Sequence, residues 1–274
     1  MHAEIMMSGK DNGLGDESIS GKTVIVTGGG YGIGKQIALA FGRLGANVIV
    51  AARSLEKLEN VADELRAMDT DPLSLRIDIS SESDVRSMVD QIVEKYQSID
   101  VLVNNSAISG PTAMVPDIEL DEWRETVDIN LNGTFFCCKY VSRVMREAKS
   151  GNIVTLSSVA GRTAYPLRAA YCVTRWGVIG LSHTLAAELG PHGIRVNAVV
   201  PGPIEGERSE NVFRTRAKVE DMSVEEVKRF FTKDIPIGRM ATEHEVANSV
   251  VFLASDSSSG IHGQIIQVDG GFRI

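Results

Sequence analysis

Short apolar runs alternate with amphipathic segments along most of the chain. After Ser81, a residue type that caps helix N-termini, Val85, Met88 and Ile92 recur at helical spacing. Strands that alternate with such helices predict an α/β fold with a doubly wound parallel sheet flanked by helices. Seven runs read as its buried strands: Thr23–Thr27, Asn47–Ala51, Leu73–Ile77, Val101–Val103, Asn152–Leu156, Arg195–Val199 and Ile265–Val268.

Two segments depart from this alternation. Residues 1–20 are polar and glycine-rich without a sustained period, so we expect a disordered N-terminal tail before a single domain at 21–274. Residues 203–234 form a long insertion after the sixth strand. Within it, Val224, Val227 and Phe231 share one helical face, which predicts a helical lid over a substrate site.

A glycine-rich turn follows the first predicted strand. Gly28, Gly32 and Gly34 lie between that strand and a helical pattern beginning near Ile37. Glycine permits positive φ and a close approach to a diphosphate, and a helix N-terminus attracts anions. The spacing G-x-x-x-G-x-G differs from the usual G-x-G-x-x-G, and a plain tight turn is the alternative interpretation. The flanking strand and helix favour phosphate binding.

Tyr171, Arg175 and Ser158 are candidates for moving a proton at an oxygen atom. A phenol has a pKa of about 10 and exchanges protons poorly at neutral pH unless a nearby charge stabilises its anion. Arg175 follows Tyr171 by four residues, so both share one helical face. Ser158, at the end of the fifth predicted strand, can hydrogen-bond a substrate oxygen. The trio is suited to a carbonyl or alcohol substrate.

Other polar or glycine-containing segments also follow predicted strands. In a doubly wound sheet, ligands bind beyond the carboxyl ends of the strands. We therefore expect one crevice lined by the glycine turn and by the residues after the second to sixth strands, namely Arg53, Asp78, Asn104, Ser158 and Pro201.

Composition narrows the class of partner. The 274 residues include 36 acidic and 28 basic ones, and the net charge of −8 disfavours nucleic acid and anionic membranes as partners. No run reaches the roughly 18 apolar residues of a membrane span, and the first residues lack a signal peptide's apolar block. The three cysteines and five histidines show no metal-binding spacing. We expect a cytoplasmic protein with a small-molecule partner and no metal.

The chain resembles the classical short-chain dehydrogenase/reductase family, in its 3-oxoacyl reductase-like branch. The resemblance covers about residues 20–272, and it implies a Rossmann-type domain that binds a nicotinamide cofactor. It is carried by six motifs in family order and approximate spacing: Thr27–Gly34, Asn104–Ala107, Asn130, Ser158, Tyr171–Arg175 and Pro201–Gly202.

The resemblance also implies roles for individual residues. Tyr171 would exchange a proton with the substrate oxygen during hydride transfer, while Ser158 would polarise that oxygen. Asn130 would orient a water in a proton relay, or would serve only to kink its helix. Asp78 and Ile79 would contact the adenine. The remaining residues implied to bind the cofactor, together with Tyr171 and Arg175, are Gly28, Tyr31, Gly32, Ile33, Gly34, Asn104, Ser106, Pro201, Gly202 and Ile204.

Cofactor choice depends on the residues that end the second strand. A carboxylate there would accept hydrogen bonds from a ribose 2′-hydroxyl, whereas an arginine can bind a 2′-phosphate. Ala52 and Arg53 occupy this point, which predicts NADP(H) over NAD(H). A solvated arginine that merely begins the next helix is the alternative.

Arg175 departs from the family pattern, which has lysine there. Arginine keeps the positive charge but is effectively never deprotonated and presents a rigid fork. Three interpretations follow: a natural variant that works with arginine, a regulatory or scaffold protein that binds cofactor with little catalysis, or an engineered substitution. The retention of Ser158, Tyr171 and Asn130 favours an active enzyme.

Substrate and assembly are less specified. Arg208, Arg214, Arg216 and Lys218 make the first half of the lid basic, which suits either an anionic substrate or a solvated helix face. The resemblance implies a homotetramer, and the helices that carry Asn130 and Tyr171 have more apolar surface than one sheet face would cover.

Overall fold

The computed structural model of the protein describes residues 17–272. Its seven strands form one parallel sheet in the order β3-β2-β1-β4-β5-β6-β7, which confirms the predicted α/β class. The strands are β1 (Thr23–Thr27), β2 (Asn47–Ala52), β3 (Leu73–Arg76), β4 (Val101–Asn104), β5 (Gly151–Leu156), β6 (Ile194–Pro201) and β7 (Ile265–Val268).

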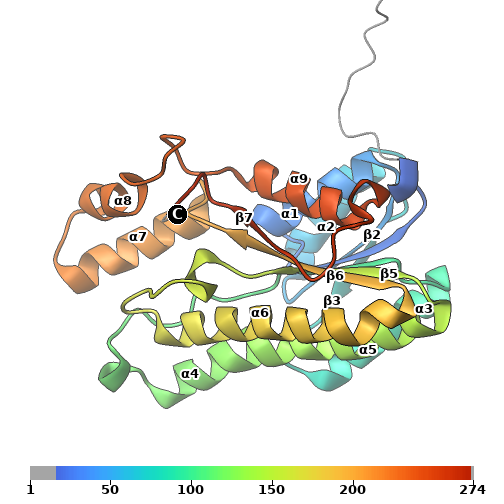
Figure 1. Cartoon of the computed structure of the whole chain (residues 1–274), viewed down its shortest axis with the longest axis horizontal. Helices are drawn as coiled ribbons and strands as arrows, with labels where there is room; N and C mark the ends of the chain where they lie inside the picture. Colours follow the sequence, from blue (N-terminus) through green and yellow to red (C-terminus); the bar gives the residue numbers. More distant parts are fainter. Residues whose placement is uncertain (1–16, 273–274) are drawn as a thin grey trace, which may run out of the picture.

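Helices cover both faces of the sheet (Figure 1). One face carries α1 (Gly32–Arg43), α2 (Leu55–Arg66) and α9 (Glu243–Ala254). The other carries α3 (Glu82–Tyr96), α5 (Gly133–Ala148) and α6 (Ala169–Leu189), while α4 (Leu120–Val127) leads into α5 through a π-helical stretch, Asp128–Asn132. Ser81 caps α3 as predicted, because its hydroxyl accepts a hydrogen bond from the Asp84 N–H.

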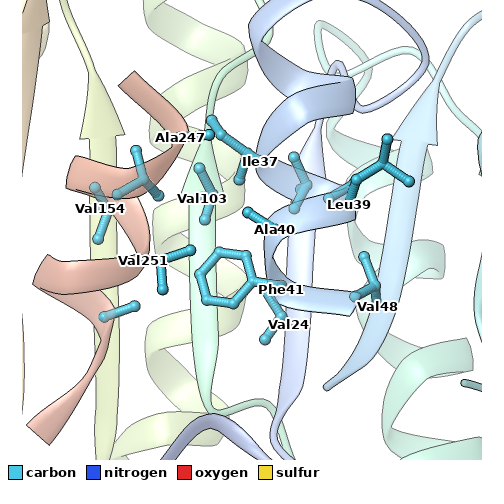
Figure 2. Close-up of a cluster of buried hydrophobic side chains, with 14 of the residues drawn as sticks. Val24, Ile37, Leu39, Ala40, Phe41, Val48, Val103, Val154, Ala247 and Val251 are labelled. Carbon is cyan, nitrogen blue, oxygen red and sulfur yellow. The ribbon is translucent and has the colours of Figure 1, made fainter. Parts of the chain in front are cut away.

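The core lies in two layers, one on each side of the sheet. Every residue of β1 is buried, as expected of a central strand that has helices on both faces. In the layer beneath α1 and α9, the fully buried ring of Phe41 packs among aliphatic side chains from the sheet and from both helices (Figure 2). These layers fix the strands whose carboxyl ends carry the site.

Three residues that we expected in the disordered tail, Glu17–Ile19, are ordered. Glu17–Ile19 form a 3-10 helix, and Ile19 is buried in the core layer that contains α1 and α9. Its apolar side chain therefore places the domain boundary before residue 20. The rest of the expected tail, residues 1–16, lies outside the described residues.

The insertion after β6 contains two helices, α7 (Glu207–Glu220) and α8 (Val224–Thr232), which project beyond the carboxyl end of that strand (Figure 1). A capping box of Ser223 and Glu226 begins α8. The ring of Phe231 in α8 stacks on Phe213 of α7, with centroids 5.6 Å apart, and on Tyr165, 5.3 Å away. The apolar face recognised in the sequence thus anchors α8 beside the loop that precedes α6.

The strand order changes direction between β1 and β4. From β1 the chain proceeds outward to β2 and β3, and then returns to β4 on the opposite side of β1. The loops that leave these two strands diverge to opposite faces, and a crevice opens between them at the carboxyl edge of the sheet.

Candidate active site

A cleft lies at this carboxyl edge. It is lined by the glycine turn, the loops after β4, β5 and β6, the start of α6 and the start of α7. Most of the residues predicted for the site line it together: Gly28, Tyr31, Gly32, Ile33, Gly34, Ser106, Ser158, Tyr171, Arg175, Pro201, Gly202 and Ile204.

The turn after β1 has the geometry that a phosphate group requires. Gly28 has φ +67°, and a Cβ on Gly34 would overlap the Gly28 carbonyl oxygen, so both positions need glycine. The side chain of the N-cap residue, Tyr31, does not cap α1, and the first residues of this helix, Gly32, Ile33 and Gly34, line the cleft. The N–H donors of these residues suit a diphosphate.

Asn105 holds this turn in place. Its Nδ2 donates to the carbonyl oxygens of Thr27 at 3.0 Å and of Gly28 at 3.2 Å. Asn104, which we predicted as the cofactor contact, is buried instead, and its Nδ2 donates to Cys138 Sγ at 3.2 Å. Successive side chains of a strand point to opposite sides, so Asn105 reaches the cleft and Asn104 does not. The asparagine pair marked the position, and a contact between Asn104 and the cofactor stays a prediction.

Tyr171, Arg175 and Ser158 meet in the cleft as the spacing predicted. The Arg175 guanidinium lies 5.0 Å from the centroid of the Tyr171 ring, one helical turn along α6. Ser158, in the loop after β5, lines the cleft beside Tyr171, and its side chain contributes to lowering the pKa of the phenol. Burial raises the pKa of Tyr171, but the charges of Arg175, Arg208 and Arg168 and the Ser158 side chain together outweigh burial and lower it.

The guanidinium of Arg175 is buried with incomplete hydrogen bonding. Its Nη1 donates to the Leu156 carbonyl oxygen at 2.9 Å, whereas Nε and Nη2 find no acceptor in the part of the chain that the structure describes. Burial lowers the pKa of this group. Orphaned donors at a cleft wall fit a ligand that brings acceptor oxygens, such as a cofactor ribose.

Asn130 lies fully buried in the π-helical stretch and away from the cleft lining. Its Oδ1 accepts from the Ile108 N–H at 2.8 Å, and its Nδ2 donates to the Ile108 carbonyl at 3.0 Å and to Thr174 Oγ1 at 3.3 Å. The amide therefore ties the loop after β4 to α6. These contacts support the structural interpretation, and the water relay stays a prediction.

Three residues predicted to bind the adenosine end lie outside the cleft lining. Arg53 is exposed just after β2, and Ile79 is buried. Asp78 Oδ1 accepts from the Ser80 N–H at 3.0 Å and from its hydroxyl at 2.7 Å. The loops after β2 and β3 thus flank the cleft rather than line it.

Two further residues at this site, Lys57 and Glu243, were not predicted from the sequence. Lys57 Nζ lies 5.0 Å from the ring centroid of Tyr31, and its spacing of four from Arg53 was the available signal. Glu243, the first residue of α9, also lines the cleft beside Gly206, and burial raises its pKa. No motif pointed to Glu243. Among the described residues, no cluster of His, Cys, Asp and Glu suits a metal ion.

Comparison with known proteins identifies the family. The profile described as Enoyl-(Acyl carrier protein) reductase matches residues 28–273. The 3-oxoacyl-[acyl-carrier-protein] reductase FabG of Staphylococcus aureus is 38% identical over 251 residues, which are 91% of this chain and 97% of that protein. The chain belongs to the classical short-chain dehydrogenase/reductase family. It is thus an oxidoreductase related to the 3-oxoacyl reductases.

Solved structures of the short-chain dehydrogenase/reductase family share this fold. NAD+-bound xylitol dehydrogenase superposes with a TM-score of 0.90 at 32% identity, covering 92% of this chain and 99% of that one. A variant of actinorhodin polyketide ketoreductase with NADPH gives 0.87 at 32% identity, covering 92% and 97%. One of these relatives thus holds NAD+ and the other NADPH. The two together support a nicotinamide cofactor for this chain but do not distinguish NAD(H) from NADP(H).

Proposed function

We propose that this protein is an NADP(H)-dependent oxidoreductase that interconverts a ketone and a secondary alcohol. The observation that carries the proposal is the meeting of Tyr171, Arg175 and Ser158 in a cleft that also contains a glycine turn suited to a diphosphate. A phenol, a fixed cation and a hydroxyl in this arrangement can hold a carbonyl oxygen and protonate it.

The chain's own residues handle the substrate oxygen. When bound, the cofactor supplies a hydride to the carbonyl carbon or takes one from the carbinol carbon. The Ser158 hydroxyl donates a hydrogen bond that holds and polarises the oxygen. The Tyr171 hydroxyl gives its proton to that oxygen in reduction, and the resulting phenolate recovers a proton from solvent; in oxidation, the phenolate accepts the proton.

Arg175 would serve both the cofactor and the phenol. Its charge stabilises the Tyr171 phenolate, and its Nη2 and Nε, which have no acceptor within residues 17–272, are suited to the oxygens of the nicotinamide ribose. Neither job requires the side chain to lose a proton, so arginine can perform both where the family pattern has lysine.

The preference for NADP(H) rests on the charges after β2. Arg53 and Lys57 are the cations nearest this strand end in sequence, and Ala52 and Arg53 stand where a carboxylate would select NAD(H). Lys57 lies over the Tyr31 ring at the cleft edge. A guanidinium and an ammonium here suit a 2′-phosphate.

The same proposal includes a small-molecule substrate and a homotetramer. Phe135 on α5 and Val173 and Trp176 on α6 are between 46% and 53% exposed, which leaves an apolar surface on the outer side of these helices. A second copy of the chain that covers this surface would bury it.

In residues 17–272 no helix combines the length and the apolar character that crossing a bilayer demands.

An NADPH-consumption assay with a panel of ketones and 3-oxoacyl thioesters tests the proposal. We expect turnover by the wild-type chain, and a loss of about 10²–10⁴-fold in Tyr171→Phe, because that change removes the proton donor. NADPH binding, followed by fluorescence, should be retained in the variant. Wild-type protein that binds NADPH but consumes none with any member of the panel would show that the proposal is wrong.

A further inference from the structure

Three arginine side chains act on the ring of Tyr171. The guanidinium carbons of Arg168 and Arg175 lie 5.1 and 5.0 Å from its centroid. The charge of Arg208, at the start of α7, lowers the pKa of Tyr171 and of both other arginines. Within residues 17–272, no carboxylate forms a salt bridge with any of the three. Glu205, Glu207 and Glu243 line the same cleft, but none of them pairs with the three guanidiniums, which are therefore left without a direct counter-ion among the described residues.

Arg168 is the most constrained of these cations. It is 5% exposed at the residue that precedes α6, and its Nη2 donates to the Ser109 carbonyl oxygen at 2.7 Å. Its Nε is buried and has no acceptor among the residues that the structure describes. Desolvating a cation without a counter-ion is costly, and an anionic ligand would offset that cost.

The position of Arg168 separates it from the glycine turn that suits the cofactor's diphosphate. Arg168 bonds the loop after β4 and adjoins Tyr165, whose ring stacks on Phe231 of the lid. The glycine turn that suits the diphosphate belongs instead to β1 and α1. Arg168 thus stands on the lid side of Tyr171, where the part of the substrate beyond the reacting carbonyl would extend.

We propose that the substrate is an oxo acid whose free carboxylate is bound by Arg168 and Arg208, one to three carbons from the reacting carbonyl. This inference rests on the proposed function and names its substrate class. A carboxylate suits the site because the Arg168 guanidinium lies 5.1 Å from the centroid of the Tyr171 ring, so an anion bound there would be close to the oxygen that Tyr171 protonates. A 3-oxoacyl thioester is uncharged at that position.

Calorimetric titration of the NADP+-loaded protein tests the inference without requiring turnover. The probes are 2-oxobutanoate, 3-oxobutanoate and 4-oxopentanoate, each against its methyl ester. We expect at least one acid to bind about tenfold more tightly than its ester, as one charge-assisted hydrogen-bonded pair allows. Acetate should compete with that acid, and inorganic phosphate should compete no better than acetate.

Variants of α7 locate the effect. Arg208→Gln should remove most of the preference for the acid, and Arg208→Lys should restore part of it because the charge returns. Arg214→Gln is the matched control, since Arg214 is exposed on the same helix and does not line the cleft. Arg168→Gln would act similarly, but Arg208 is the primary test because its exposed position leaves folding unaffected.

Several results would overturn the inference. If none of the acids binds more tightly than its ester, a carboxylate site is excluded, whichever substrates the enzyme turns over. A loss of NADP+ affinity in Arg208→Gln, with the acid preference intact, would assign this guanidinium to the cofactor. If inorganic phosphate competes with the oxo acid more strongly than acetate does, the site does not select a carboxylate. Acid preference in binding without NADPH consumption for any probe would support this inference and count against the proposed redox function.

Discussion

At the scale of single residues, the position of Arg175 has an energetic cost and a chemical benefit. A guanidinium with two unpartnered nitrogens among the described residues is costly to bury, yet this position places its charge against the ring of Tyr171. Part of the cost would be recovered when ligand oxygens reach the free donors. The residue thus links cofactor binding to the readiness of the phenol to exchange its proton.

The sequence predicted side chains at this scale unevenly. The spacing of Tyr171 and Arg175 sufficed because a helix puts residues four apart on one face. Asn104 and Asn105 are adjacent in the sequence, and only the register of β4 decides which of them faces the cleft. The position of Glu243 depends on how α9 packs beside the glycine turn, a tertiary contact that leaves no local pattern.

Arg53 provides a test of cofactor choice. Arg53→Ala should lower the preference for NADPH over NADH about tenfold, because it removes a charged partner of the 2′-phosphate. The measurement is the ratio of kcat/KM for the two cofactors with one ketone. Arg43→Ala, in the last turn of α1, serves as a cationic control and should leave the ratio unchanged. If Arg53→Ala leaves the ratio of kcat/KM for NADPH over NADH unchanged, Arg53 is a solvated arginine that does not select the cofactor.

At the scale of elements, the start of α9 is fixed by a charged cap. Thr242 Oγ1 accepts from the Glu245 N–H at 3.2 Å, and Glu245 Oε2 accepts from the Thr242 N–H at 2.8 Å. Arg239 also pairs with Glu245, with Nη2 and Oε1 2.7 Å apart. The Arg239 hydrogen bond and then the Thr242 N–H lower the pKa of Glu245 to about 2. This cap sets the position of Glu243 at the cleft.

Glu245→Gln should reveal the pH dependence of this cap. Because the folded-state pKa is depressed below the ordinary 4.5, the carboxylate stabilises the fold above pH 4.5, and this contribution is lost as pH falls toward about 2. The variant should unfold with about 1 kcal/mol less free energy than the wild type at neutral pH, and the gap should close in acid. Denaturant titrations at several pH values measure it.

A matched variant tests whether that gap belongs to the cap. Glu94 is exposed on α3 and has no ion pair among the described residues, so Glu94→Gln should show no comparable loss at any pH. A gap for Glu245→Gln that persists unchanged below pH 2 would contradict an electrostatic origin for the stability that the cap contributes.

The sequence was most informative about the positions of the helices and strands. The predicted strands Thr23–Thr27 and Ile265–Val268 have the observed bounds, because β-branched runs bounded by polar or glycine residues leave little freedom. The sequence did not predict the π-helical stretch Asp128–Asn132 between α4 and α5. That stretch depends on the bonds of Asn130 to a distant loop, which a local pattern cannot encode.

At the scale of the whole molecule, the sheet gathers residues that are far apart in the chain. The residues lining the cleft span Gly28 to Glu243, and they meet because all seven strands are parallel and end at one edge. Alternating strands and helices predicted this convergence. The placement of the lid over the cleft depends on aromatic stacking between Tyr165, Phe213 and Phe231, whereas the local pattern indicated only the apolar face of α8.

The apolar surface of α5 and α6 leads to a prediction about assembly. Trp176→Glu should shift the protein from a tetramer to smaller species in light scattering at micromolar concentration, because a buried charge opposes association. Leu55→Glu, an equally drastic change on α2 at the opposite face of the sheet, should leave the mass unchanged. A wild-type monomer would remove the basis for the homotetramer.

The dependence of alcohol oxidation on pH tests most directly whether Arg175 primes Tyr171. Oxidation requires the phenolate, whose formation the arginine charge favours, so the rate should rise with pH below the usual range for tyrosine. Arg175→Lys keeps the charge and should keep this profile, whereas Arg175→Met should move the rising limb to higher pH. The same limb in the wild type and in Arg175→Met would contradict the central claim that this guanidinium prepares Tyr171 for proton transfer.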